Sequence, residues 1–534
     1  MGMRTGCSSM ITAAMLAGFA APGAHAGAVG AELTSALTTR ASHADVPVLI
    51  RFADKLDPAP YAVKDRRRRD NALAVALHER WQRTQGPLKA FLADHGAKRV
   101  KDLWLINGVA ATVSANLVGQ LAAFPGVEIV ELDSSLRRSG VVRPRSAQTP
   151  QPDAALPANG DIPAQRVAAE AKSALPAWNI AAVNAPALWH TGITGRGVIV
   201  ANMDTGVDVN HPDLAPRWRG GGHSWFDPHG QHAAPYDASG HGTQTMGIMV
   251  GGSASGSAIG VVPDARWIAV KLFNDAGEAS LSDIHVAFQW LMDPDDDPTT
   301  VDSPDVVNAS WNLGGRAIGA CNLEFDDDIR VLRAAGIAVV FAAGNDGPAA
   351  GTSDSPGNNP QGFSVGAVDR HLAVARNASR GPSACDGAVF PTLVAPGVNV
   401  RTADRSYGGL PSYSVVSGAS FAAPHAAGVL ALLASAFPHA SVDELESAVV
   451  RSAWQPATSE GVTSYGNGLA DAVAAYSALA ADAGSASTAP QAAYADGDGC
   501  LHERRHGAVD SRLAAQVGST STAPLRLGIT RAGQ

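Results

Sequence analysis

Apolar residues between positions 178 and 480 form short uninterrupted runs that alternate with amphipathic stretches. The runs predict strands at 198–203, 267–272, 306–309, 338–342 and 362–368. Between them, apolar residues recur with helical spacing at 282–292 and 326–335. Strands that are apolar on both faces and alternate with helices are typical of a parallel sheet covered by helices on both sides. The fold class predicted for this region is therefore α/β.

A second, smaller pattern lies upstream, between residues 44 and 137. Its predicted strands and helices follow the order β-α-β-β-α-β, over 46–50, 72–92, 102–106, 108–114, 115–123 and 127–132. A turn is expected at Asn107-Gly108, and an interruption of the first helix at Gly86-Pro87. This order predicts a small α+β domain of the ferredoxin-like kind. The arginine run at 66–69 is interpreted as a solvated face, with a processing site as the alternative.

The two ends of the chain and the segment between the domains have different compositions. Arg4, an apolar run at 11–21 and small residues around His25 predict an export signal over residues 1–26, cut before Gly27. A buried N-terminal helix is the alternative, and the run is too short for a permanent membrane anchor. We therefore expect a secreted protein, extracellular or, as the alternative, periplasmic. The other predicted divisions are a domain over 27–137, a cleavable linker over 138–177, the α/β domain over 178–480 and a low-complexity tail over 481–534.

The composition of the 534 residues narrows the function classes. Hydrophobic residues make up 46% and charged residues 17%, which excludes a wholly disordered or fibrous chain. Lys and Arg number 40 and Asp and Glu 49, so the net charge at pH 7 is −9. Because no overall basic field would attract a polyanion, no nucleic-acid partner is expected.

The chain contains four cysteines, of which Cys7 falls in the predicted export signal. An exported location permits disulfides, and the remaining Cys321, Cys385 and Cys500 allow at most one intramolecular pair. We favour Cys321–Cys385, because both residues lie in the α/β domain. Unpaired or differently paired thiols stay open as the alternative, since sequence does not fix connectivity.

Three segments of the α/β domain place a chemically active side chain at the boundary of a predicted element. Asp204 ends an apolar strand. His241 stands between two glycines in the segment Ser-Gly-His-Gly-Thr at 239–243, which leaves its ring free of neighbouring side chains. Ser420 lies at the start of an apolar helix, where unpaired backbone N–H groups and the helix dipole favour a developing anion. Taken singly, each is more often a turn residue, a structural histidine or an N-cap.

A fourth segment contributes Asn345, which follows an apolar strand and has glycines close on either side. Together the four groups can form a nucleophilic relay. An imidazole accepts the serine proton near neutral pH, and a carboxylate fixes the tautomer of the imidazole. An amide can donate to the oxyanion of a tetrahedral intermediate.

The four segments together resemble the subtilisin-like serine proteases, the subtilases, over residues 180–479. By this resemblance Asp204 orients His241, which acts as base and then as acid, while Ser420 attacks and Asn345 lines the oxyanion hole. The resemblance implies a subtilisin-like parallel sheet and endopeptidase activity on polypeptides through an acyl-enzyme. It also identifies the domain at 27–137 with the inhibitory, fold-assisting propeptide of this family, so the chain would be a self-processing zymogen. We expect a monomer.

The resemblance further indicates where an extended substrate would bind. One edge is expected at Ser280, Leu281 and Ser282. The other edge, with one wall of the first specificity pocket, is expected at Ser310, Trp311, Gly314 and Gly315, and Ala343 and Gly344 complete the predicted substrate-binding residues. The Trp-Asn pair at 311–312 interrupts the pocket-wall sequence that is common in the family. In this respect the chain is similar to a bacillopeptidase F-like branch of the family.

No cofactor is required for this chemistry, but calcium is common in the family. Four carboxylates lie close together along the chain, at Asp293, Asp295, Asp296 and Asp297. They lack a regular ligand spacing and are flanked by prolines, so a solvated acidic loop is favoured over a structural calcium site. Two other functions would use the same scaffold: a peptide-binding module without turnover, and an esterase or exopeptidase. The sequence leaves open the residues preferred around the cut, the physiological substrate and the mature N-terminus.

Overall fold

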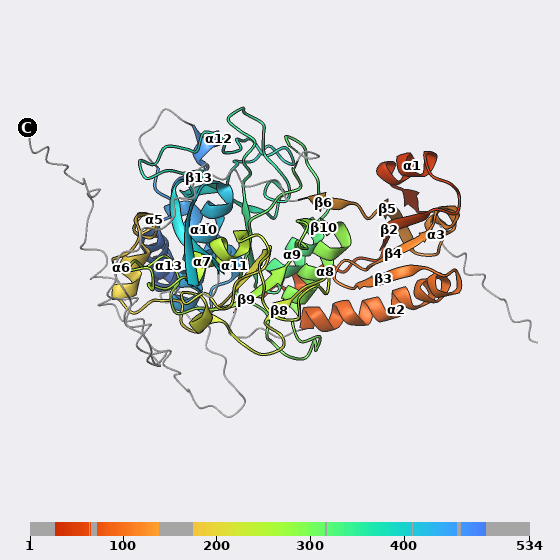
Figure 1. Cartoon of the computed structure of the whole chain (residues 1–534), viewed down its shortest axis with the longest axis horizontal. Helices are drawn as coiled ribbons and strands as arrows, with labels where there is room; N and C mark the ends of the chain where they lie inside the picture. Colours follow the sequence, from red (N-terminus) through yellow and green to blue (C-terminus); the bar gives the residue numbers. More distant parts are fainter. Residues whose placement is uncertain are drawn as a thin grey trace, which may run out of the picture.

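The computed structural model describes residues 27–63, 65, 72–137, 175–314, 318–407, 410–455 and 461–486. The predicted export signal, the arginine run at 66–69, most of the predicted linker and residues 487–534 of the predicted tail lie outside the described residues. The described chain forms an N-terminal α+β domain and a larger α/β domain that lie side by side (Figure 1).

The N-terminal domain is a five-stranded sheet with three helices. Its strand order is β1-β5-β2-β4-β3, made of β1 (Ala28–Val29), β2 (Asp45–Phe52), β3 (Lys98–Leu103), β4 (Gly108–Ser114) and β5 (Val127–Leu132). The helices are α1 (Ala31–Thr38), α2 (Ala72–Asp94) and α3 (Val118–Ala122). Without the short β1, the order is the one that the predicted β-α-β-β-α-β chain gives in a ferredoxin-like sheet.

Two local expectations for this domain are wrong. Helix α2 runs without a break through Gly86 and Pro87, because Leu88 and Leu92 beyond the proline are fully buried against the sheet. The strand expected at 102–106 ends at Leu103 and is followed by a turn. Strand β1 and helix α1 were not predicted, since two and eight residues give too little periodicity to stand out.

The larger domain is built on a seven-stranded sheet in which every neighbouring pair is parallel. Its order is β14-β13-β12-β11-β7-β9-β8, made of β7 (Ile199–Asp204), β8 (Trp225–Phe226), β9 (Arg266–Lys271), β11 (Val306–Ala309), β12 (Ala338–Ala342), β13 (Phe363–Val368) and β14 (Leu393–Pro396). The α/β prediction is confirmed, and the two strands that it lacked, β8 and β14, are the short ones at the two edges.

Helices cover both faces of this sheet (Figure 1). One face carries α7 (His241–Val250) and α10 (Ala419–Ala436), with α5 (Trp178–Ala182), α6 (Ala185–His190), α11 (Val442–Ser452) and α13 (Ala472–Ala486) around them. The other face carries α8 (Leu281–Met292) and α9 (Asp326–Ala334). A hairpin of β15 (Val400–Tyr407) and β16 (Leu410–Val416) packs on α7, and α12 (Val462–Tyr465) is a single turn. Three-residue 3₁₀ turns lie at Ala59–Tyr61, Ala115–Leu117 and Ala215–Arg217.

Helix α10 is the one helix among the described residues that is long and apolar enough to cross a membrane, with a mean hydropathy of 1.4. The α/β domain buries 83% of it. Its hydropathy is therefore that of a central core helix, which contacts β11, β12, β13 and β14.

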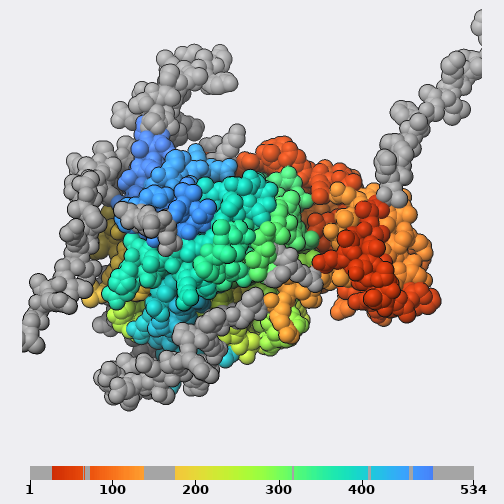
Figure 2. Space-filling view, turned by 90° about the horizontal axis from the view of Figure 1, so that it is seen from above, coloured from red at the N-terminus to blue at the C-terminus, as the bar shows by residue number. Residues whose placement is uncertain are grey.

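The two domains share one apolar core. Leu49, Leu73 and Leu77 of the N-terminal domain belong to the same cluster of buried side chains as Phe288 of α8 and Ile329 of α9. Figure 2 shows the N-terminal domain in red and orange against the green part of the larger domain. Because the contact is apolar and continuous, the two domains stabilise each other.

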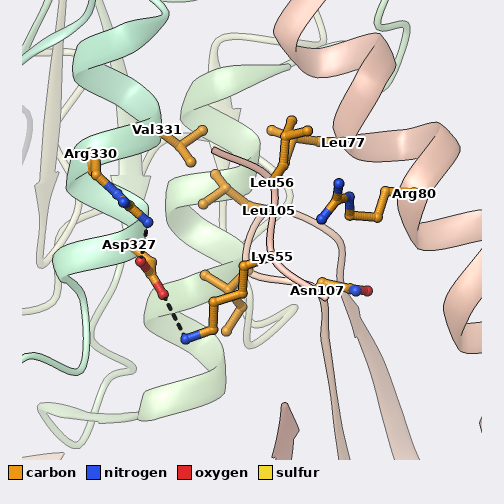
Figure 3. A pocket seen from close by; sticks show the side chains of 10 residues that line it. Lys55, Leu56, Leu77, Arg80, Leu105, Asn107, Asp327, Arg330 and Val331 are labelled. Carbon is orange, nitrogen blue, oxygen red and sulfur yellow. Dashed lines mark hydrogen bonds and ion pairs between the residues drawn. The ribbon is translucent and has the colours of Figure 1, made fainter. Parts of the chain in front are cut away.

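Polar contacts surround this shared core. Strand β6 (Ser135–Arg137) follows the N-terminal domain and pairs antiparallel with β10 (Glu278–Ser280) of the larger domain. Arg51 forms an ion pair with Glu324, and Lys55 Nζ lies 3.2 Å from Asp327 Oδ2. A narrow cavity between the domains is lined by residues of both, among them Lys55 and Asp327 (Figure 3).

Cys321 and Cys385 form a disulfide, the pair that the sequence favoured. The bond ties the segment after β11 to the loop between β13 and β14. Cys500 lies outside the described residues.

Candidate active site

Asp204 and His241 form a buried pair at the carboxyl end of the sheet. Asp204 is the last residue of β7, and His241 is the first residue of α7. His241 Nδ1 lies 2.8 Å from Asp204 Oδ1 and 2.9 Å from Oδ2. The two side chains are 1% and 3% exposed, so the contact is screened little by water. The pair fixes the imidazole with Nδ1 towards the carboxylate and leaves Nε2 for another partner.

The loop before His241 is shaped by Asp237, a residue that the sequence analysis missed. Asp237 Oδ1 accepts hydrogen bonds from the N–H groups of Ser239 and Gly240, at 2.9 and 2.8 Å. Its Oδ2 accepts from Thr243 N–H at 2.9 Å, beyond the histidine. One carboxylate therefore closes the turn that presents His241. The only sequence signal is an acceptor two to six residues before these N–H groups, and that spacing is common in ordinary turns.

Ser420 is the second residue of α10, the central core helix. Its Oγ donates to the carbonyl oxygen of Ser310 at 3.4 Å, and Ser310 Oγ donates to the Ser420 carbonyl at 2.8 Å. The next residue, Phe421, has its ring centroid 5.3 Å from that of His241. The structure thus brings the start of α10 beside His241, but no hydrogen bond joins Ser420 to His241 among the described residues.

Asn345 lies just after β12 and contacts the start of α10. Its Oδ1 accepts a hydrogen bond from Ala419 N–H at 2.9 Å. Because the amide oxygen is held in this way, the Nδ2 group is left as a donor next to Ser420. Gly344 before it has a φ of 106°, a conformation that favours glycine and turns the chain sharply after the strand.

Buried amides connect these elements beneath the site. Asn308 Nδ2 of β11 donates to Asn202 Oδ1 of β7 at 2.9 Å and to Ser310 Oγ at 3.0 Å. Asn202 Nδ2 in turn donates to the Gly242 carbonyl at 2.9 Å, next to His241. This chain of hydrogen bonds runs from α7 through two strands to Ser420. The sequence analysis included both asparagines in apolar strands and missed their role, since a polar residue inside a strand shows no partner until the sheet is assembled.

A sequence model described as the subtilase family matches residues 195–482, the part of the chain that contains Asp204, His241, Asn345 and Ser420. The chain belongs to the subtilase family. It is 33% identical to Bacillopeptidase F of Bacillus subtilis over 411 residues, which cover 72% of this chain and 26% of that protein. It is 32% identical to Subtilisin E of the same organism over 366 residues, which cover 67% of this chain and 80% of that protein.

A solved structure supports the same fold. The crystal structure of fervidolysin from Fervidobacterium pennivorans, described as a keratinolytic enzyme related to subtilisin, superposes with a TM-score of 0.57 and 20% sequence identity. The match covers 81% of this chain and 61% of that one. The larger domain is thus a subtilisin-like α/β fold, as predicted.

One of the expected substrate edges differs from the prediction. The subtilase has its edge strand at β10 (Glu278–Ser280), so Ser280 lies in it, but Leu281 and Ser282 form the first turn of α8. The helix begins there because the Ser280 side chain accepts from Asp283 N–H and the Asp283 side chain accepts from Ser280 N–H. The extended segment here, β10, therefore begins and ends two residues earlier than the edge expected at 280–282.

The other predicted edge directly follows β11. Ser310 contacts Ser420, and Gly314 is half-buried, while Gly315 lies outside the described residues. The Trp311 side chain does not form a pocket wall: it is 5% exposed and lies among Phe288, Phe325 and Phe341 in the core. Its large apolar ring is better buried there, so only its backbone can line the edge. Ala343 and Gly344 are buried between Asn345 and the sheet.

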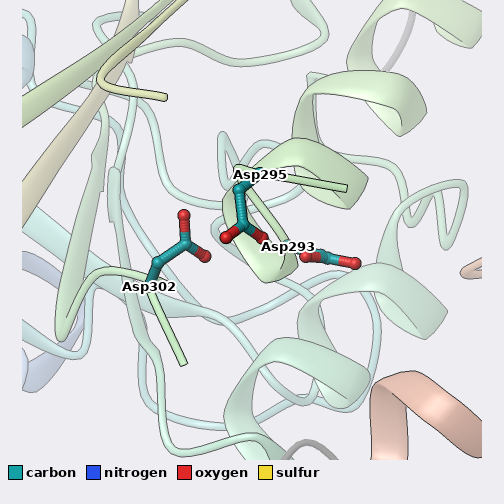
Figure 4. Close-up of side chains that lie close together, drawn as sticks. All are labelled: Asp293, Asp295 and Asp302. Carbon is teal, nitrogen blue, oxygen red and sulfur yellow. The ribbon is translucent and has the colours of Figure 1, made fainter. Parts of the chain in front are cut away.

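In the acidic loop after α8, the aspartates that lie together are not the four that the sequence groups. Asp293 and Asp295 converge with Asp302, which the sequence analysis did not include, and one carboxylate oxygen of each lies within 4.8 Å of the others (Figure 4). Burial and the neighbouring carboxylates raise the pKa of Asp293 to about 7 and that of Asp302 to about 6. Asp296 and Asp297 are not part of this cluster. These three carboxylates are the group among the described residues that could hold a cation.

Proposed function

We propose that this subtilase is a secreted serine endopeptidase, made as a self-processing zymogen, which cuts polypeptides through Asp204, His241 and Ser420. The buried pair of His241 and Asp204, which lies beside the start of α10, is the observation that carries the proposal. Its imidazole uses one nitrogen for the carboxylate and has the other available for a proton. That asymmetry is what a general base needs and what a purely structural histidine lacks.

In the proposed reaction, Ser420 Oγ leaves the Ser310 carbonyl by rotation about its Cα–Cβ bond and donates to His241 Nε2. His241 takes the proton as Oγ attacks the scissile carbonyl carbon, and Asp204 stabilises the imidazolium. The imidazolium then protonates the leaving amine, which produces the acyl-enzyme. Water, deprotonated by the same imidazole, releases the acyl group.

The developing oxyanion would be stabilised by two donors. The first donor is Asn345 Nδ2, because the hydrogen bond from Ala419 N–H holds the amide oxygen of Asn345 away from the oxyanion. The Ser420 backbone N–H in the first turn of α10 is the other, supported by the helix dipole. These groups need no cofactor for the chemistry.

The N-terminal domain is proposed to act as the propeptide and inhibitor of the same chain. Its β6 strand already pairs with β10, which is the edge where an extended substrate would add by main-chain hydrogen bonds. Asp133 also caps the next helix, accepting from Ser282 N–H at 2.9 Å and from Ser282 Oγ at 2.7 Å. A substrate cannot use this edge until the N-terminal domain leaves, so we propose that cleavage within 138–177 activates a monomeric enzyme.

Replacement of the serine tests the activity. Ser420→Ala should lower kcat for casein hydrolysis by about 10⁶-fold while the protein remains folded. Ser435→Ala, which removes a hydroxyl from the same helix away from the site, should keep full activity. Blocked internal peptides should be cut more efficiently than free-ended peptides or simple esters. Casein hydrolysis by Ser420→Ala at the parent rate would contradict the proposal.

The zymogen part has a separate test. N-terminal sequencing of the active secreted protein should give a first residue between 138 and 178. Full activity of a chain that still begins at Gly27 would contradict the propeptide role and leave the proposed catalytic residues unaffected.

A further inference from the structure

A buried carboxylate that the proposed reaction does not use lies beside the expected specificity pocket. Asp354 is 0% exposed, and neither of its oxygens has a hydrogen-bond partner of normal geometry among the described residues. Within the described part of the chain, the groups that act on it are the carboxylate of Asp346 and the N–H groups of Ser355 and Gly314, and no basic side chain is among them. An unpaired buried carboxylate is costly, so its retention calls for a partner.

The position of Asp354 follows from its two neighbouring segments. On one side Leu313 N–H donates to the Ser355 carbonyl at 2.9 Å, which places Asp354 against the segment that leads back to Ser310. On the other side Asp346 directly follows Asn345. Both segments contact the start of α10, the first through Ser310 and the second through Asn345. Asp354 therefore lies between the predicted wall at 310–314 and the oxyanion donor.

We infer that Asp354 binds the cationic side chain of an arginine or lysine on the acyl side of the cut, an inference that rests on the proposed endopeptidase function. In this proposal the Asp354 carboxylate, between the wall segment and the oxyanion donor, is reached by the side chain of the substrate residue whose carbonyl is attacked. A guanidinium or ammonium supplies the charge and the donors that Asp354 lacks. The predicted linker is rich in such residues, with arginines at Arg138, Arg143, Arg145 and Arg166, so self-processing should also occur after an arginine.

Matched peptides test this directly. With blocked peptides that differ only at the residue before the cut, the mature enzyme should prefer Arg and Lys over Leu, Phe and Ala. Asp354→Asn should lower kcat/KM for the Arg peptide by about 100- to 1,000-fold and leave the Leu peptide within a few-fold. Asp386→Asn, which alters an exposed aspartate in the loop between β13 and β14, should change neither. An unaltered preference in Asp354→Asn, or a parent enzyme that prefers apolar residues, would overturn the inference without affecting the proposed function.

Benzamidine binding gives a readout that needs no turnover. Calorimetry should detect binding of this amidinium to the mature enzyme, and at least a tenfold weaker affinity in Asp354→Asn. Equal affinities, or no binding to the parent enzyme, would overturn the inference even if the protein hydrolysed no peptide.

Discussion

Two buried histidines of this protein are held by carboxylates, yet only one is arranged for proton transfer. His241 of α7 has Nδ1 on Asp204 and no hydrogen bond at Nε2 among the described residues. His285 of α8 has both nitrogens engaged: Nδ1 lies 2.9 Å from Asp328 Oδ2, and Nε2 lies 2.9 Å from Glu324 Oε1. Carboxylate contact alone therefore does not distinguish a catalytic histidine from a structural one.

The surroundings of His285 keep it a cation at neutral pH. It is fully buried, which by itself lowers its pKa, but Asp328 and Glu324 outweigh burial and raise the pKa to about 9. Glu324 also pairs with Arg51, so this cluster connects α8 and α9 to the N-terminal domain. A third buried histidine, His425, contacts only the Phe421 carbonyl and Asn179, and burial lowers its pKa to about 4. One fold thus holds one histidine charged and another neutral, and leaves a nitrogen of the third free to react.

The comparison predicts its largest effect at the reactive histidine. His241→Ala should lower kcat by about 10⁶-fold, because no other group near Ser420 can accept the proton. His285→Gln should retain kcat within a few-fold in the folded fraction. Assays with a blocked peptide, together with circular dichroism to measure that fraction, check both. Comparable losses of kcat in the two variants would contradict the distinction between a proton-transferring His241 and a structural His285.

Asp204→Asn should lower kcat by about 10⁴-fold, since the amide can hold the ring in the wrong tautomer and cannot stabilise the imidazolium. KM for the same peptide should change little, because Asp204 is buried away from substrate. If Asp204→Asn keeps more than a tenth of the parent kcat, the carboxylate does not support proton transfer by His241. Its contact with His241 would then be structural, like the carboxylate contacts of His285.

Asn345→Leu removes the proposed oxyanion donor while keeping the size of the side chain. We expect kcat to fall by about 100- to 1,000-fold with KM nearly unchanged. Steady-state kinetics separate the two parameters. A change confined to KM would assign Asn345 to substrate binding instead.

His285 should govern stability rather than chemistry. Its folded pKa lies above the ordinary value near 6.5, so its contribution is fully present below about pH 6.5 and is lost as pH rises through 9. The free energy of unfolding should fall by about 2 kcal/mol between pH 7 and pH 10, as measured by urea unfolding of the Ser420→Ala protein. His285→Gln should flatten this dependence, whereas His425→Gln should keep it, because His425 is already neutral at pH 7. An equal slope in all three would contradict the charge assigned to His285.

The strands of the larger sheet were predictable because burial on both faces leaves uninterrupted apolar runs, as in β12. The proposed catalytic side chains could be singled out for a related reason: Asp204, His241 and Ser420 lie at element boundaries among small residues. The short edge strands β8 and β14 were missed, since contacts with their neighbours decide them. The start of α8 lies at Leu281, one residue before the predicted start, because the Ser280 cap fixes it.

The supporting residues could not be predicted from the sequence. Asp237, Asn308 and Asp302 act on groups that are distant along the chain or on another element. His285 has the same difficulty, because its charge depends on Asp328, 43 residues away, and on Glu324. A sequence shows that a polar residue is present, and only the assembled fold shows what satisfies it.

The rate at which Ser420 reacts with a fluorophosphonate measures the activation of its hydroxyl most directly. In the mature protein, peptide mapping should find the label on Ser420, and His241→Ala should slow the labelling by several orders of magnitude while His285→Gln does not. Equal labelling rates in the parent and in His241→Ala, or a label on a different residue, would contradict the account.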